Sequence, residues 1–164
     1  MARKAFYSFY FPGDSHRASQ VRNIGVIEGN QTVSDNTWEQ IKQGGETAIK
    51  RWINDQMKGK SAVIVLIGAK TSQRKYVKYE IEKGWNDGKG VLGIHIHNLK
   101  NLAGEQSPKG RNPFSDFEVN GTNLSNIVKA YDPPYSTSTK VYEHIKNNLS
   151  AWVEEAIKIR NNYK

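Results

Sequence analysis

Runs of uncharged, mostly apolar residues alternate along this chain with stretches in which apolar residues recur every three or four positions. The clearest run covers 61–67, and further runs lie at 5–11, 91–96 and, more briefly, 127–131. Continuous apolar runs of this length are typical of strands that are buried on both faces of a sheet. The four runs therefore predict the strands of a parallel sheet.

Helical spacing fills the intervals between these runs. Apolar residues recur with that spacing over 48–57, and Val77, Ile81 and Trp85 follow one another at intervals of four. A wide apolar stripe over 136–161 predicts a C-terminal helix. Strands that alternate with helices indicate βαβ units, whose right-handed crossovers place helices on both faces of the sheet. We therefore expect an α/β, flavodoxin-like three-layer sandwich with a central parallel sheet of four or five strands.

Short polar residues mark the expected starts of helices. Residues 12–15 would end the first strand and begin a short helix that turns Ala18 and Val21 inward. Thr71 or Ser72 would cap the helix that follows the second strand.

Two segments lack a clear period. Residues 24–43 are rich in Gly, Asn and Asp, as in a loop or a poor edge strand. Residues 99–135 form a polar, loop-rich excursion in which only 113–117 is amphipathic. A chain of 164 residues is the size of one ordinary domain, so we expect a single domain over 1–164.

The composition excludes several classes of protein. Cysteine is absent, which excludes disulfide scaffolds, thiolate metal sites and cysteine nucleophiles. No apolar run approaches the length of a membrane-spanning helix, and the first residues do not resemble a secretory signal. We therefore expect a cytoplasmic protein without a membrane partner.

The chain carries 24 Lys and Arg against 16 Asp and Glu, a net charge of +8. Such a balance suits nucleic acid, a membrane surface or a small molecule that carries phosphate. Because no block of like charges occurs, a solvated basic surface is favoured over a nucleic-acid footprint. We expect only weak, salt-sensitive binding to nucleic acid and no specific nucleic-acid partner.

Two features could carry chemistry, and each has a plainer interpretation. His95 and His97 would share one face at the end of a strand, where a metal site is conceivable but strand-end packing is favoured. Ser72, Tyr76 and Glu80 lie at intervals of four, one residue away from the apolar row of their helix. Glu80 would thus lie at the margin of the buried stripe, where a carboxylate can stabilise an oxocarbenium ion or attack it. Alternatively, it belongs to a solvated, ion-paired helix surface.

A series of short motifs resembles, in order, the TIR-like domains, including the TIR subunit of Thoeris antiphage defence. Together they cover roughly residues 3–98, and the likeness is weaker beyond. The motifs are KAFYSF (4–9), RNIGV (22–26), WEQIK (38–42), AIKRWI (48–53), VIVLIG (63–68), YVKYEIEK (76–83) and GIHIHN (93–98).

The resemblance implies a flavodoxin-like fold and cleavage of the nicotinamide–ribose bond of NAD. Some members cyclise the ADP-ribose product into a signal that activates a separate effector. The family's catalytic glutamate falls on Glu80 and not on Glu82, although Tyr76 stands where Trp is common. NAD is the substrate, and the chemistry requires no metal or further cofactor.

At the carboxyl ends of the strands, Phe6, Ser8, Tyr10, Ser72 and Tyr76 are expected to bind the substrate. Phe6 and Tyr10 could equally belong to the core of the sheet.

Residues 24–43 depart from the Arg-Asp-x-x-Pro-Gly loop of receptor TIR domains, so pairing through that loop is not expected. Many TIR domains are scaffolds, which leaves a non-catalytic assembly module as the alternative to an enzyme. Exposed aromatic residues within 99–135 would favour self-association.

Overall fold

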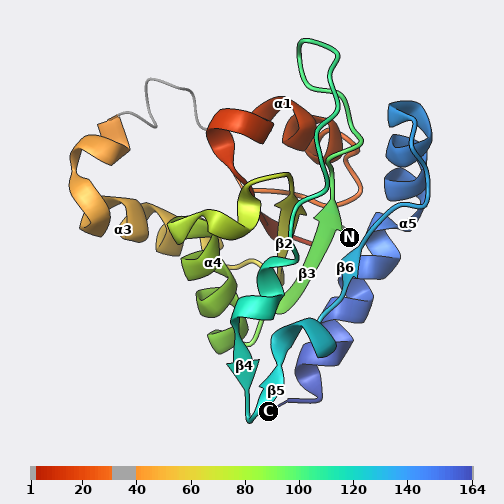
Figure 1. Cartoon of the computed structure of the whole chain (residues 1–164). Helices are drawn as coiled ribbons and strands as arrows, with labels where there is room; N and C mark the ends of the chain where they lie inside the picture. Colours follow the sequence, from red (N-terminus) through yellow and green to blue (C-terminus); the bar gives the residue numbers. More distant parts are fainter. Residues whose placement is uncertain (1–2, 31–39, 164) are drawn as a thin grey trace.

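A parallel sheet of four strands forms the centre of the computed structural model, which describes residues 3–30 and 40–163 (Figure 1). One register row crosses all four strands, from Ser8 through Val65 and Gly93 to Ala130. The strands, in their order across the sheet, are β1 (Ala5–Ser8), β2 (Ala62–Ile67), β3 (Gly90–His95) and β6 (Ala130–Tyr131).

Beyond β1, a single parallel bridge joins Lys4 to Glu28. After β1, the chain first pairs with the outer edge of this strand at residue 28. It then crosses to the opposite edge of β1, where it forms β2. This reversal makes the carboxyl end of β1 the topological switch point of the sheet, where ligands of open α/β folds bind. The poor edge strand expected within 24–43 is reduced to this bridge, and residues 31–39 lie outside the described part.

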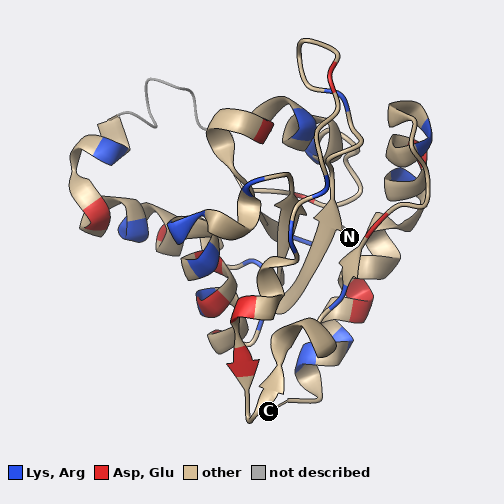
Figure 2. Cartoon of the chain, viewed as in Figure 1, with Lys and Arg blue, Asp and Glu red and all other residues tan. Residues whose placement is uncertain are grey.

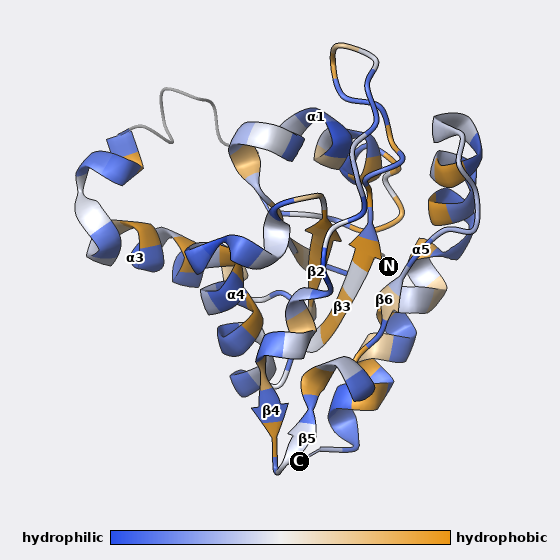
Figure 3. Ribbon diagram, in the orientation of Figure 1, coloured by the Kyte–Doolittle hydropathy of each residue, from blue (hydrophilic) through white to orange (hydrophobic). Residues whose placement is uncertain are grey.

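Helices cover both faces of the sheet, which confirms the flavodoxin-like α/β sandwich. On one face lie α1 (Phe11–Arg22) and the long α5 (Ser138–Asn161), and on the other lie α3 (Gly45–Met57) and α4 (Lys75–Asn86). Successive strand residues feed the two cores alternately, because side chains of a strand point to opposite faces. Ile64 of β2 packs with α1 and α5, whereas Val65 packs with α3 and α4. Figure 3 shows the resulting apolar centre.

The apolar spacing predicts the buried helix faces correctly. Ala18 and Val21 of α1 are fully buried, and so is Ile81 of α4, which Val77 and Trp85 accompany. The predicted first strand is too long, however. It ends at Ser8, and Phe11 already begins α1, with Pro12 in the first turn, where a proline costs no hydrogen bond.

Thr71 and Ser72 do not cap α4, contrary to the sequence prediction. They belong to a separate turn of 3₁₀-helix, η1 (Thr71–Gln73), and α4 begins after Arg74 without a side-chain cap. The Thr71 hydroxyl instead accepts a hydrogen bond of 2.8 Å from the backbone N–H of Gly68. This bond closes the loop that follows β2.

The segment 99–135 is ordered by short elements that the sequence does not reveal. A hairpin turns at Asn120 and Gly121, whose positive φ angles of 51° and 81° suit a tight two-residue turn. Phe114 is fully buried, and of the aromatic residues in this segment only Tyr135 is exposed, so the expected set of exposed aromatics is wrong. The elements are η2 (Pro113–Asp116), β4 (Glu118–Val119), β5 (Thr122–Asn123) and η3 (Leu124–Asn126).

Charged residues are spread over the helices and loops rather than gathered on one element (Figure 2). Many are paired, as are Arg3 with Glu154 and Lys129 with Glu155. Within the described part of the chain, no helix combines the length and the apolarity that crossing a bilayer requires.

The contact between β3 and α5 can be tested at Gly90. A Cβ atom at this position would lie 2.7 Å from the backbone nitrogen of Ile157 and 2.8 Å from the carbonyl carbon of Ala156. Because backbone atoms cannot move aside, we expect Gly90→Ala to lower the free energy of unfolding by about 1–3 kcal/mol. Urea denaturation measures this, with Ala151→Ser on the exposed side of α5 as the control. An unchanged urea midpoint in Gly90→Ala would contradict the packing described.

Candidate active site

A pocket of about 430 Å³ opens at the carboxyl end of β1, between α1, α3 and α4. It occupies the switch point of the sheet, where the topology leads us to expect a ligand. Aromatic rings provide much of its lining, and Glu80 is the only carboxylate among the described residues that line it.

Glu80 reaches the pocket because of its position on α4. The apolar row of this helix packs onto the sheet, and Gly84 allows close approach, since a Cβ there would lie 2.6 Å from Val63. Glu80 precedes Ile81 of that row by one residue, or about 100° around the helix, and so faces the end of β1. The side chain is only 7% exposed. The margin position predicted from the spacing is therefore more deeply buried than expected.

Among the described residues, Ser8 at the end of β1 provides the one hydrogen bond to this carboxyl group. Its hydroxyl donates to Oε1 of Glu80 over 2.5 Å. Burial raises the pKa of Glu80 from its ordinary 4.5 to about 8, and the Ser8 hydrogen bond opposes that rise only in part. A pKa so displaced in a pocket is typical of groups that act in catalysis.

Several aromatic side chains surround Glu80. Phe6 is 1% exposed and belongs both to the core beside α3 and α4 and to the pocket wall, so a place in the core does not exclude a place in the pocket. Tyr10 and Tyr76 also line the pocket, as the sequence predicts. Trp52 of α3 lines it as well. The rings offer flat apolar surfaces to a heterocycle or a sugar face.

Four basic residues line the same pocket, although it holds a single acid: Arg22, Lys42, Arg74 and Lys75. The guanidinium of Arg22 donates to the side chain and the carbonyl of Asn30, whose Oδ1 also accepts from the N–H of Tyr7 over 2.9 Å. This network ties the end of α1 and residue 30 to β1. The excess of positive charge suits a ligand that carries phosphate.

The structure does not place every predicted residue in the pocket. Neither Ser8 nor Ser72 is among the residues that line the pocket. Ser8 contacts the carboxyl group of Glu80, whereas Ser72 is buried in η1. Sequence reasoning missed Arg22, Asn30 and Arg74. Nothing in the sequence shows that the side chain of Asn30 accepts a hydrogen bond from the backbone of β1, as a neighbouring strand would. The sequence therefore does not connect Arg22 and Asn30 with β1.

His95 and His97 lie outside this pocket. Their ring centres are 5.9 Å apart and the side chains are largely buried, and the Nδ1 atom of each has no hydrogen-bond partner within the described part of the chain. Burial lowers the pKa of His95 to about 4. Among residues 3–30 and 40–163, no group of three possible ligands could hold a metal ion. Both side chains are buried at and just after the end of β3, as the packing interpretation expects.

Glu82, two residues after Glu80, is exposed on α4. It lines a shallow surface depression together with Lys50, Lys75 and Lys78. The two glutamates thus share a helix and a chemistry but differ in burial, which makes Glu82 a matched control for Glu80.

The family model for the Thoeris protein ThsB, TIR-like domain, matches residues 6–101. This range is more than half of the chain, and it includes residues 6–8 of β1, the pocket residues described above, and the whole of α4. The chain belongs to the ThsB TIR-like family. The match confirms the resemblance found in the sequence motifs.

A curated relative from Bacillus cereus (strain MSX-D12) bears the name "Putative cyclic ADP-D-ribose synthase ThsB1". It is 37% identical to this TIR-like chain over 119 residues, which is 70% of the chain and 62% of the relative. The chain thus corresponds to somewhat less than two thirds of the relative's length.

The burial of Glu80 gives this TIR-like domain a pH-dependent stability that can be measured. The folded state binds a proton at Glu80 more tightly than the unfolded state, so stability falls as pH rises from about 4.5 to about 8. Glu80→Gln removes this penalty. We expect the variant to gain about 1.4 kcal/mol over the wild type for each pH unit within that window, and nothing further outside it.

Urea unfolding of both proteins at several pH values measures the difference. Glu82→Gln, as the control, should follow the wild type at every pH. Curves of wild type and Glu80→Gln that run parallel from pH 4.5 to 8 would show that the Glu80 carboxyl titrates normally.

Proposed function

We propose that this protein cleaves the nicotinamide–ribose bond of NAD and converts the ADP-ribose part into a cyclic or otherwise modified signal for antiphage defence. The observation that carries the proposal is Glu80, a buried carboxyl group with a raised pKa in a pocket lined by aromatic rings and cations. Membership of the ThsB family and the name of the Bacillus cereus relative support the same reaction.

The chemistry fits a single carboxylate. As the bond between the anomeric carbon and the pyridinium nitrogen breaks, its electron pair goes to nicotinamide, which leaves as a neutral molecule. The ribosyl centre becomes an oxocarbenium-like cation, which the charge of Glu80 stabilises at short range in a pocket lined largely by aromatic rings. Water, or a nucleophilic atom of the same ADP-ribose, then attacks that carbon and releases a proton.

The raised pKa gives Glu80 a second property. With a pKa of about 8, the carboxyl group is mostly protonated in the free protein at neutral pH. A bound nicotinamide ring carries a positive charge, which favours the ionised carboxylate and lowers its pKa. Substrate binding is therefore coupled to loss of a proton from Glu80, so the charge develops where and when the cationic substrate requires it.

The remaining lining of the pocket suits the rest of NAD. The rings of Phe6, Tyr10 and Tyr76 provide surfaces for the sugar and the heterocycles, and the basic residues face a diphosphate that carries negative charge. The residues need no metal for this reaction, since the leaving group departs without protonation.

A diffusible product connects the reaction to its effect. We propose that the product activates a separate effector protein, and that the protein works in the cytoplasm, where NAD is supplied. Self-association upon activation belongs to the same proposal.

Replacement of one atom tests the role of Glu80. Glu80→Gln keeps the shape of the side chain and an acceptor for the Ser8 hydroxyl, but it cannot oppose the charge of the ribosyl centre. We expect nicotinamide release to fall by about 10²–10³. Purified protein is incubated with NAD, with and without lysate of phage-infected cells as trigger, and free nicotinamide is quantified by chromatography.

Glu82→Gln is the control, because it makes the same chemical change on the exposed side of α4 and should keep full activity. Equal release by the two variants would remove Glu80 from the reaction. No release by the wild type under any trigger would favour a non-catalytic assembly module instead.

A further inference from the structure

Arg74 stands out among the basic residues of the pocket by its geometry. It immediately precedes α4, and its Cζ atom lies 3.6 Å from the centre of the Tyr10 ring. Gly13 makes room for that ring, since a Cβ at residue 13 would lie 2.8 Å from its edge. The guanidinium and the phenol ring are thus held together between the start of α1 and the start of α4.

The positive charge of Arg74 lacks a counter-charge in residues 3–30 and 40–163. Lys75 pairs with Glu46 over 2.8 Å, and Arg22 donates to Asn30, but Arg74 has no ion pair, and its buried Nε has no hydrogen-bond partner. The first turn of α4 contains no acidic residue and has no side-chain cap. A cation at the positive end of a helix is unfavourable unless an anion is bound there.

The stack determines which atoms of Arg74 remain available to a ligand. A guanidinium that lies on a ring uses its flat face, so the N–H groups at its edge stay free to donate in the plane. That planar fork matches two oxygens of a phosphate, and Arg is preferred over Lys where such two-point recognition is required. Arg74, which immediately precedes α4, and Glu80, which lies within it, line the same pocket.

We propose that Arg74, held on the ring of Tyr10, binds the diphosphate group of the dinucleotide substrate and selects dinucleotides over nucleosides. This inference rests on the proposed function, because the ribose between the anomeric carbon and the diphosphate would span the interval from Glu80 to Arg74. Arg74 would anchor the part of the molecule that does not react, and thereby position the bond to be broken.

Binding of fragments tests this without reference to catalysis. ADP-ribose carries the diphosphate, and adenosine lacks it. We expect Arg74→Ala to weaken the binding of ADP-ribose by about tenfold to a hundredfold in calorimetry, because it removes a two-point hydrogen bond between charged groups. Arg74→Lys keeps the charge without the fork and should lose an intermediate amount. Adenosine should bind equally, however weakly, to all forms.

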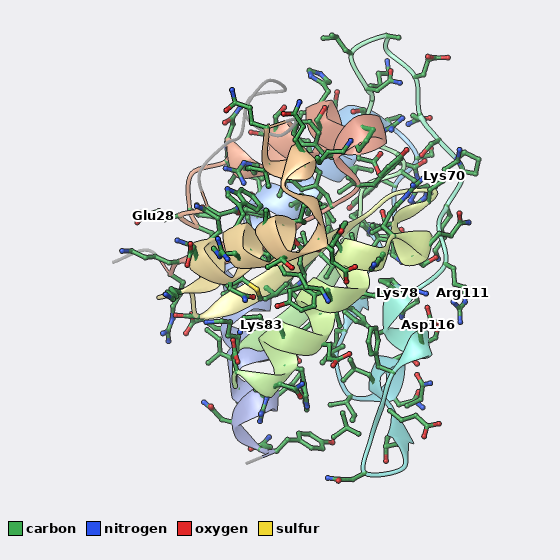
Figure 4. The ribbon with its side chains drawn as sticks, turned by 90° about the vertical axis from the view of Figure 1, so that its left-hand side faces the viewer. Glu28, Lys70, Lys78, Lys83, Arg111 and Asp116 are labelled. Carbon is green, nitrogen blue, oxygen red and sulfur yellow. The ribbon has the colours of Figure 1, made fainter. Side chains whose placement is uncertain are left out.

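Lys83→Ala is the control for loss of a positive charge from the same helix. Figure 4 shows Lys83 on a different side of α4 from Lys78, and it pairs with Asp87 over 2.9 Å. This variant should bind ADP-ribose within about twofold of the wild type, since Lys83 is not among the residues that line the pocket and its charge is already paired. Thermal unfolding of each variant shows whether the fold is intact.

Three outcomes would overturn the proposal. They are failure of the wild type to bind ADP-ribose, equal affinity of wild type and Arg74→Ala, and equal losses for ADP-ribose and adenosine. The proposed function can fail independently of this site. If the wild type binds ADP-ribose through Arg74 but never releases nicotinamide from NAD, the diphosphate site is supported and the catalytic assignment of Glu80 is wrong.

Discussion

The burial of one carboxyl group at the end of β1 is the constraint on which the site depends. Glu80 is removed from water by the packing of α4 on the sheet, and the Ser8 hydroxyl is its only hydrogen-bond partner among the described residues. A fold selected for stability alone would replace such a group, because its charge is costly to bury. In this protein the free-energy cost of burying the charge serves a purpose. A cationic substrate bound at the site would stabilise the ionised carboxylate and so offset that cost.

The architecture follows from periodicity to a large extent. The central strands are continuous apolar runs because helices cover both faces, and Val77, Ile81 and Trp85 mark the buried side of α4 directly. Periodicity fails where apolar residues serve another purpose. Phe9 and Phe11 continue the pattern of the first strand, yet Phe11 begins a helix and lines the pocket. Hydrophobicity alone cannot distinguish a pocket wall from a core.

The candidate site was only partly predictable, because several of its residues lie far apart in the sequence and meet only in the folded chain. Spacing placed Glu80 near the buried stripe, and family resemblance selected it over Glu82, but neither shows that Ser8 is its partner, 72 positions away. In the same way, the position of Arg74 depends on its stacking against Tyr10, and that of Arg22 on its hydrogen bond to Asn30. Ser72, which shares the helical spacing of Glu80, lies in a separate 3₁₀ turn, so spacing that assumes one continuous helix misplaces it.

A crystal structure of the Glu80→Gln variant soaked with NAD would test the central claim, that the bond is broken against this side chain, most directly. The variant should bind the dinucleotide without consuming it. We expect the anomeric carbon of the nicotinamide ribose to contact residue 80 within the pocket at the end of β1. A dinucleotide bound elsewhere, or one whose nicotinamide ribose points away from residue 80, would contradict the account.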